Sequence, residues 1–349
     1  MKEQTTSSRK QHFDLLRIIA CFSVVMLHSS AQYWYGLEVT DHRWLVANSY
    51  DAVFRFGVPV FVMISGALFL GREKIDTKKL YKHNILRILI LYVVWSVLYG
   101  LFHCRAVPMG ELTAGTVFRE ILSNSYHLWF LPMIAGLYML VPILHIWIKN
   151  ATKKDIEYLL LIFFVLQILL TTMKALVTWP ILDYVGGMVK LELICGYSGY
   201  FVLGYYLDQY EIERDKRKVL YIAGVISVIA NIVLGNWLSL RSNTPKADIY
   251  DSFGLFTCLV VMALFVACRS ISMKESDKVC KMLKFVADAT LGIYLLHIGV
   301  MDFLNGYGVN SMMVHPLIGI PLLAAASFLI CLIIAKVLQK IPAVGRYIC

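Results

Sequence analysis

Charged residues are scarce in this sequence, at 16% of its 349 residues. An ordinary soluble domain carries about 25%, so the low proportion argues against a soluble globular protein. Three motifs of well-understood chemistry are also missing: the GxSxG nucleophile elbow, the phosphate-binding GxxxxGK[ST] loop and the HExxH zinc motif. Their absence removes the usual signatures of serine hydrolases, P-loop nucleotidases and zinc peptidases.

The eight cysteines show neither disulfide nor metal-ligand spacing. Most of them fall inside apolar segments, where cysteine acts as a small hydrophobic residue. No pair of histidines has zinc-ligand spacing either, and no carboxylate is obviously associated with one. We therefore expect no metal site.

Long apolar runs dominate what is present, since 59% of the residues are hydrophobic. Runs of about 20 residues are long enough to cross a hydrocarbon layer of about 30 Å. The fold class is therefore all-α, a polytopic transmembrane helix bundle of about ten spans. Their expected positions are 13–33, 53–70, 85–103, 128–148, 156–178, 190–207, 219–240, 252–269, 285–305 and 315–338. We see no linker, so residues 1–349 are predicted to form a single integral-membrane domain with spans from about 13 to 338.

The net charge of +10 is distributed unevenly over the connecting segments. With the N-terminus placed in the cytoplasm, the inner segments hold 23 Lys and Arg and the outer segments hold 6. Cytoplasmic loops collect these residues, so both termini are predicted to be cytoplasmic. Since this bias explains the positive charge, and no basic stretch is interleaved with aromatics, we expect no nucleic-acid partner.

Two outer segments, 34–52 and 104–127, are long enough to cover an external mouth. The second is predicted to contain a short helix lying in the membrane interface, because Val117, Phe118 and Leu122 give it an apolar side. An ordinary loop remains the alternative.

Arg17 and His28 lie inside the first long apolar segment. Placing a charge at membrane depth costs roughly 2.5–3.5 kcal/mol on insertion scales. Eleven residues make three helical turns plus roughly 20°, with a rise of about 16 Å, so both side chains share one face and suggest a polar track. Asp14, three residues before Arg17, can pair with it; the alternative is an arginine that snorkels to the interface.

Three histidines are predicted to share the outer side: His28, His127 and His297. Histidine suits general-base work near neutral pH, so we take His28 as the catalytic candidate and His127 and His297 as supporting polar residues. The alternatives are a hydrogen-bonded core histidine for His28 and an exposed interfacial residue for His127.

A basic cluster marks the cytoplasmic start of the third span. We take Lys82, His83 and Arg87 as candidates for holding the phosphates of a nucleotide-like cofactor. The alternative is the positive-inside bias with contacts to anionic lipid, which is the stronger reading for the lysines. Arg87 lies a turn deeper, at about the level of Arg17, and is the main candidate.

The sequence resembles the membrane acyltransferase-3 family. The signature is an Arg, ten residues and a His in the first span, here Arg17 and His28. Further matching stretches are FRFGVPVFVMISGALFL (54–70), LRILILYVVWS (86–96), YHLWFLPMIAGLYMLVPIL (126–144), GYFVLGYYL (199–207) and LGIYLLH (291–297). The resemblance covers about 12–338, and it is nearest to stand-alone bacterial members similar to O-acetyltransferases of surface polysaccharides. Leu91 departs from the proline that many relatives carry.

The resemblance implies a multi-pass protein of the bacterial cytoplasmic membrane. Its donor would be cytoplasmic acetyl-CoA or another acyl-CoA, and its acceptor the hydroxyl of a surface glycan or a lipid-linked glycan. By family role, His28 would be the essential acid/base, Arg17 its essential partner, and Arg87 the family arginine of the third span. No esterase-like domain follows the last span, so we expect transfer to be completed in the membrane domain, among membrane lipids.

Two functions from other classes stay open at this stage. The polar track also suits a transporter of a small polar solute such as serine, and a non-catalytic sensor is a third alternative. The sequence does not separate direct transfer from an acyl-histidine relay. It also leaves open the acceptor, the acyl chain length and the oligomeric state, a homodimer included.

Overall fold

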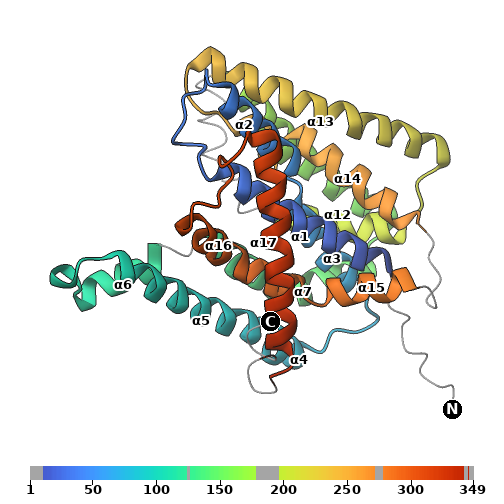
Figure 1. The fold of residues 1–349 in the computed structure, drawn as a ribbon. Coiled ribbons are helices and arrows are strands. Elements are labelled where there is room, and N and C mark those ends of the chain that lie inside the picture. The colour runs from blue at the N-terminus through green and yellow to red at the C-terminus, as the bar shows by residue number, and fades with distance from the viewer. Residues whose placement is uncertain (1–10, 124–125, 178–195, 272–277, 342–344, 346–349) are drawn as a thin grey trace.

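The computed structural model describes residues 11–123, 126–177, 196–271, 278–341 and 345. In those ranges the chain is a bundle of helices and contains no strand (Figure 1), which confirms the all-α prediction. The α-helices are α1 (Gln11–Ala31), α2 (His42–Phe54), α3 (Gly57–Leu70), α4 (Thr77–Lys79), α5 (Leu86–His103), α6 (Ala114–Ser123), α7 (Phe130–Asn150), α8 (Lys153–Ile162), α9 (Leu170–Leu176), α12 (Gly196–Gln209), α13 (Arg214–Ser242), α14 (Leu255–Arg269), α15 (Lys278–Ala287), α16 (Thr290–Gly306) and α17 (Pro316–Gln339).

Short helical segments of other types join these helices. Two π-helical stretches, η1 (Leu80–Ile85) and η5 (Phe163–Leu169), make α4–α5 and α8–α9 continuous. The 3-10 turns are η2 (Cys104–Ala106), η3 (Met109–Glu111), η4 (Tyr126–Trp129) and η6 (Asp248–Tyr250).

Eight helices in the described ranges are long and apolar enough to cross a membrane. A ninth span results if α15 and α16, which meet at a bend of 57°, are taken together. These nine correspond to nine of the ten expected spans. The remaining one, 190–207, begins outside the described residues, and α12 is the part of it that the structure describes. The count of ten and the cytoplasmic termini stay predictions.

One expectation about the outer segments is wrong. Residues 34–52 were expected to be a loop, but α2 begins at His42 and leads directly into α3. The polar residues Asn48 and Asp51 lower the hydropathy of this stretch, yet both are buried against protein instead of facing water. In the second outer segment the predicted short helix is confirmed as α6. Its Ile121 packs on Gly100 of α5, so α5 and α6 lie side by side and project together from the bundle (Figure 1).

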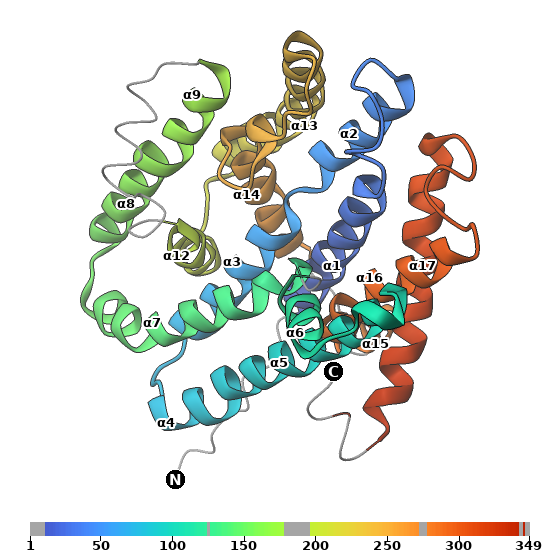
Figure 2. The same ribbon diagram turned by 90° about the vertical axis from the view of Figure 1, so that its left-hand side faces the viewer.

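Helix α1 lies in the interior, with α2, α3, α14, α15, α16 and α17 packed around it (Figure 2). The tightest helix pair is α3 with α12, where glycines allow the backbones to meet. A Cβ atom on Gly66 would stand 1.8 Å from the carbonyl oxygen of Phe201, and one on Gly204 would stand 2.0 Å from that of Met63. Small residues at helix crossings are the usual way to pack membrane helices closely.

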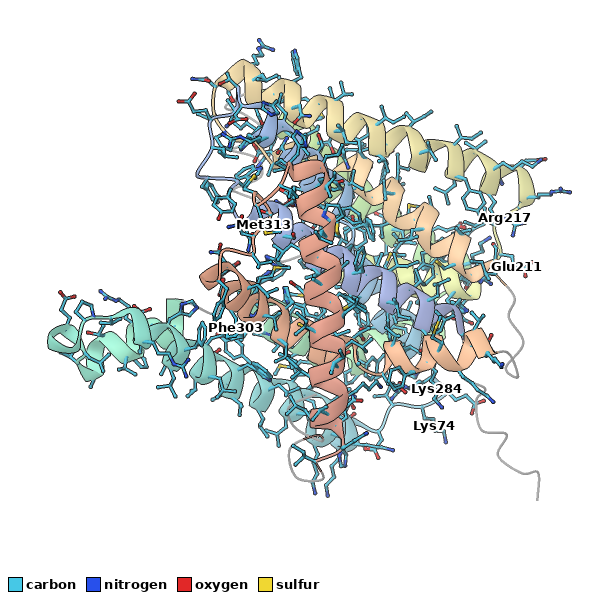
Figure 3. The ribbon with its side chains drawn as sticks, viewed as in Figure 1. Lys74, Glu211, Arg217, Lys284, Phe303 and Met313 are labelled. Carbon is cyan, nitrogen blue, oxygen red and sulfur yellow. The ribbon has the colours of Figure 1, made fainter. Side chains whose placement is uncertain are left out.

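The outward faces are apolar, as expected for a surface in lipid. Helix α13 carries a row of exposed aliphatic side chains: Val219, Ile222, Val225, Ile226, Ile229 and Val233. Lys74, Arg217 and Lys284, which come from three predicted cytoplasmic segments, lie toward one side of the molecule, whereas Phe303 and Met313 lie toward the other (Figure 3). Residues of the three predicted cytoplasmic segments thus lie on one side of the molecule, while the orientation in the membrane stays a prediction.

Candidate active site

A cavity of about 250 Å³ opens between α1, α3, α5, α7 and α16. Arg17, His83 and Arg87, which the sequence placed near the cytoplasmic side, all line it. Its other lining residues are Val24, Val58, Phe61, Ser65, Asn84, Ile88, Leu91, Phe130, Leu131, Ile134, Tyr138, Thr290, Leu291 and Tyr294. Lys82, the remaining candidate of the basic cluster, is exposed and does not line the cavity.

Arg17 faces this cavity, and one edge of its guanidinium is hydrogen-bonded to protein. Its Nη1 donates a hydrogen bond of 3.1 Å to Oδ1 of Asp14, so the contact predicted from their spacing is present. Asp14 is buried, whereas 29% of the Arg17 side chain is exposed. Arg17 therefore points into the bundle, where a ligand can meet it, and not along the lipid surface as a snorkelling residue would.

The π-helical stretch η1 brings His83 to the same cavity as Arg87. Its closing hydrogen bond runs from the amide of Leu86 to the carbonyl of Tyr81, which inserts one residue more per turn than an α-helix. Such insertions are frequent at functional sites because they change the face that a side chain occupies. Here the π-helical stretch places the imidazole of His83 and the guanidinium of Arg87 at the same end of the cavity.

The rest of the wall is mostly apolar. The apolar part of the wall includes Val24, Phe61 and Leu131. The polar groups in the wall include the hydroxyls of Ser65 and Tyr138, whose oxygens lie 3.3 Å apart. Along α1 the cavity extends from Arg17 to Val24, a rise of about 10 Å. It therefore has a cationic end and an apolar end, which is the polarity of a phosphate-bearing molecule with an apolar arm.

The three histidines of the outer side come together beyond the apolar end. The ring centroids of His28 and His297 are 5.0 Å apart, and those of His127 and His297 are 5.5 Å apart. His127 and His297 are 2% and 0% exposed, whereas His28 is only partly buried. His127 is thus not the exposed interfacial residue of the alternative reading, and His28 is the least buried residue of the three.

His297 has a defined ring orientation. Its Nδ1 lies 2.6 Å from the carbonyl oxygen of Tyr294, and since a carbonyl only accepts, Nδ1 carries the proton. The other nitrogen, Nε2, is buried and has no hydrogen-bond partner among the described residues. The same holds for both ring nitrogens of His127.

Tyrosines that the sequence reasoning missed hold this cluster in place. Tyr294 donates its hydroxyl to the carbonyl of His127 at 2.5 Å and also lines the cavity. The Tyr99 ring lies 4.6 Å from that of His127, and its hydroxyl donates to the carbonyl of Leu295 at 2.8 Å. The signal for Tyr294 was present: it precedes His297 by three residues and shares its helix face.

Tyr294 is the link between the two parts of the site. Its ring centroid is 5.9 Å from that of His297, while another part of the side chain faces the cavity. On α1, His28 lies four residues beyond Val24, a rise of about 6 Å. Tyr294 therefore borders both the cationic cavity, which it lines, and the histidine cluster, whose three rings do not line that cavity. A continuous polar track from Arg17 to His28 stays a prediction.

The remaining polar candidates lie elsewhere. Lys174 and Glu192 are further charged residues of the predicted fifth and sixth spans, and Glu192 is outside the described residues. The described cysteines, six in number, form no disulfide. In the part of the chain that the structure describes, no group of three or more His, Cys, Asp and Glu residues is arranged to hold a metal ion.

A family model described as an acyltransferase domain, acyltransferase-3, matches residues 11–336, from the first residue of α1 to the last turn of α17. The chain belongs to the acyltransferase-3 family. It is accordingly a multi-pass membrane protein and an acyltransferase. No curated protein and no solved structure matches the chain.

The stretches that match the acyltransferase-3 family supply residues of the cavity and of the histidine cluster. The first-span motif is α1, which supplies Arg17 to the cavity and His28 to the histidine cluster. The LGIYLLH stretch lies in α16 and supplies Tyr294 and His297. Residues that are far apart in the sequence thus meet in the cavity and in the histidine cluster beside it.

Proposed function

We propose that this acyltransferase-3 protein moves an acyl group, acetyl in the first instance, from cytoplasmic acyl-CoA to a hydroxyl of an extracytoplasmic glycan or glycolipid. The protein would work in the cytoplasmic membrane of a bacterium. The observation that supports this proposal is the cavity with a cationic end at Arg17, His83 and Arg87 and an apolar end beside the histidine cluster.

The donor fits this cavity by its chemistry. Coenzyme A carries phosphates at one end and a thioester on a long arm at the other. Arg17 and Arg87 offer guanidinium groups, which bind phosphate through paired, charge-assisted hydrogen bonds. With the phosphates held there, the arm follows the apolar wall toward Tyr294, and the thioester comes close to the level of His28.

The reaction then needs a base beside the thioester. The acceptor hydroxyl attacks the thioester carbonyl carbon, and His28 takes the proton of that hydroxyl. The carbon–sulfur bond breaks, the sulfur leaves as the thiolate of coenzyme A, and His28 returns the proton to it. General-base catalysis of this kind contributes about 10²- to 10⁴-fold. Since His28 is the partly exposed histidine of the cluster, it is the one assigned to this step.

The test uses purified protein in lipid vesicles, radiolabelled acetyl-CoA and, as acceptor, membranes from cells that lack the protein. We expect alkali-labile label in the membrane fraction, and a loss of about 10²- to 10⁴-fold for His28→Ala. His42→Ala is the matched control, because His42 is exposed and lies at the start of α2, away from the cavity. Full activity of His28→Ala would refute the assignment of the base. Absence of transfer by the wild-type protein, with solute uptake independent of coenzyme A, would favour the transporter instead.

A further inference from the structure

Arg55 is a charged residue deep inside a membrane-spanning segment. It follows α2 directly, in a segment from His42 to Leu70 that is long and apolar enough to span the membrane. A charge at that depth is costly and is rarely kept without a function. The motif FRFGVPVFVMISGALFL contains it, but neither its place nor its partners could be read from the sequence.

The packing of Gly57 sets the level of Arg55. A Cβ atom on Gly57 would stand 2.8 Å from the carbonyl oxygen of Ala20 and 2.9 Å from Cγ2 of Val24. The α2–α3 junction is therefore pressed against α1 at one to two turns below His28. Since α2–α3 follows α1 after a short connection and runs in the opposite direction, Arg55 lies on the His28 side of this contact.

One edge of the Arg55 guanidinium is held by protein. Its Nη2 donates to Oδ2 of Asp51 at 2.6 Å, and the side chain of Asp51 is 2% exposed. The guanidinium carbon lies 5.6 Å from the ring centroid of Tyr250, whose hydroxyl donates to Oδ1 of Asn48. Asn48 in turn donates to Oδ1 of Asn236 at 2.8 Å. This network fixes the orientation of Arg55 before any substrate arrives.

The other side of Arg55 remains available. The side chain is 30% exposed although it lies at membrane depth. Its Nε is itself buried and has no hydrogen-bond partner among the described residues. Two features thus lie at nearly the same level of the bundle: a partly exposed histidine on α1 and a partly exposed, pre-oriented cation at the end of α2. Acyl transfer needs both a base and a donor to the oxygen on which negative charge develops.

We propose that Arg55 is a catalytic residue that donates hydrogen bonds to the thioester carbonyl oxygen in the transition state; this inference rests on the proposed acyl transfer. As the acceptor oxygen bonds to the carbonyl carbon and its proton passes to His28, the carbonyl oxygen becomes negatively charged beside Arg55. The charge returns to re-form the carbonyl when the carbon–sulfur bond breaks, and coenzyme A leaves as a thiol with the proton from His28. Arg17, about 16 Å from His28 along α1, is too far away for this task.

The test compares Arg55→Gln with Arg43→Gln. Arg43 is also on α2 and also pairs with an aspartate, Asp41, but it lies at the outer end of the helix. For Arg55→Gln we expect kcat to fall by about 100- to 1,000-fold, the effect of losing one oxyanion donor, with the Kd for coenzyme A unchanged. Arg43→Gln should retain the wild-type kcat. Added guanidinium ion should restore part of the activity of Arg55→Ala and none of that of His28→Ala.

Several outcomes would overturn this inference. A folded Arg55→Gln protein with a kcat within threefold of wild type would do so and leave the proposed function standing, whereas an inactive wild type would refute the proposed function itself. If Arg55→Gln does not fold, Arg55→Lys, which keeps the cation, is measured in the same way. Failure of both to fold would assign Arg55 to the stability of the α2–α3 junction alone and would also overturn the inference.

Discussion

Replacing Arg87 with Gln should weaken the binding of coenzyme A without unfolding the protein. Arg87 lies on α5 at the cationic end of the cavity, together with Arg17 and His83. Gln keeps much of the length and the polarity of the side chain but removes its charge. The change therefore tests the contact with phosphate more directly than a truncation to Ala would.

The size of the effect follows from the kind of contact. A hydrogen bond to a charged group contributes about 1.5–3 kcal/mol, and each 1.4 kcal/mol corresponds to about a tenfold change in Kd. Loss of Arg87 should therefore raise Kd by about 10- to 150-fold. For Arg17→Gln we expect a rise in Kd within the same range, because Arg17 also lines this end of the cavity.

The assay is equilibrium titration of coenzyme A into protein in lipid nanodiscs, at two salt concentrations. Lys82→Gln is the matched control: it removes a positive charge five residues from Arg87, but Lys82 is exposed and does not line the cavity. Its Kd should stay within about twofold of wild type, since exposed charges at a distance are screened by salt.

The double variant of Arg17 and Arg87 adds a second criterion. If both guanidiniums hold one ligand, their effects on Kd should differ from a simple sum by about 0.5 kcal/mol or more, as is usual for residues that share a partner. An unchanged Kd for Arg87→Gln would remove this end of the cavity from the donor site. Equal effects of Lys82→Gln and Arg87→Gln would show that general surface charge, not the cavity, attracts the ligand.

Two further predictions concern packing and the histidine cluster. Gly66→Ala places a Cβ atom 1.8 Å from the carbonyl oxygen of Phe201, so we expect a loss of stability of about 1–3 kcal/mol or more from overpacking, measured by thermal unfolding in detergent. Gly136→Ala, where no atom lies within 4 Å of the added Cβ, should unfold no earlier than wild type, and equal stability of the two variants would contradict the close α3–α12 contact. Tyr294→Phe removes the hydrogen bond to the carbonyl of His127, worth about 1 kcal/mol. Steady-state kinetics should show kcat reduced about fivefold, and an unchanged kcat would show that this bond does not position the cluster for catalysis.

The features that could be predicted from sequence are those that depend on local order along the chain. The apolar runs located nine helices that the structure bears out, and the helical repeat placed Arg17 and His28 on one face of α1. The same repeat predicted the contact of Asp14 with Arg17 and the amphipathic helix α6. Hydrophobic length and side-chain periodicity act over neighbouring residues, so they can be read without knowing the fold.

Helix α2 was missed because hydropathy counts a polar residue as if it faced water. Asn48 and Asp51 were therefore assigned to an outer segment, although inside the protein Asn48 bonds to Asn236 and Trp34, and Oδ2 of Asp51 accepts from Arg55. These partners come from segments up to 188 residues away in the sequence. A buried polar group can be recognised only when the groups that bond to it are known.

The order of the residues is therefore enough to predict a set of helices, their apolar faces and the side chains that each helix can offer. The packing of the helices brings Arg17, His83 and Arg87 to one cavity but leaves Lys82 outside it, and it gathers His28, His127 and His297 beside Tyr294. It also sets the level of Arg55 on α1 through the close contact of Gly57 with Ala20 and Val24. The physical reason is that a helix forms from contacts within a few residues, whereas an active site forms from the way helices that are distant in the sequence pack together.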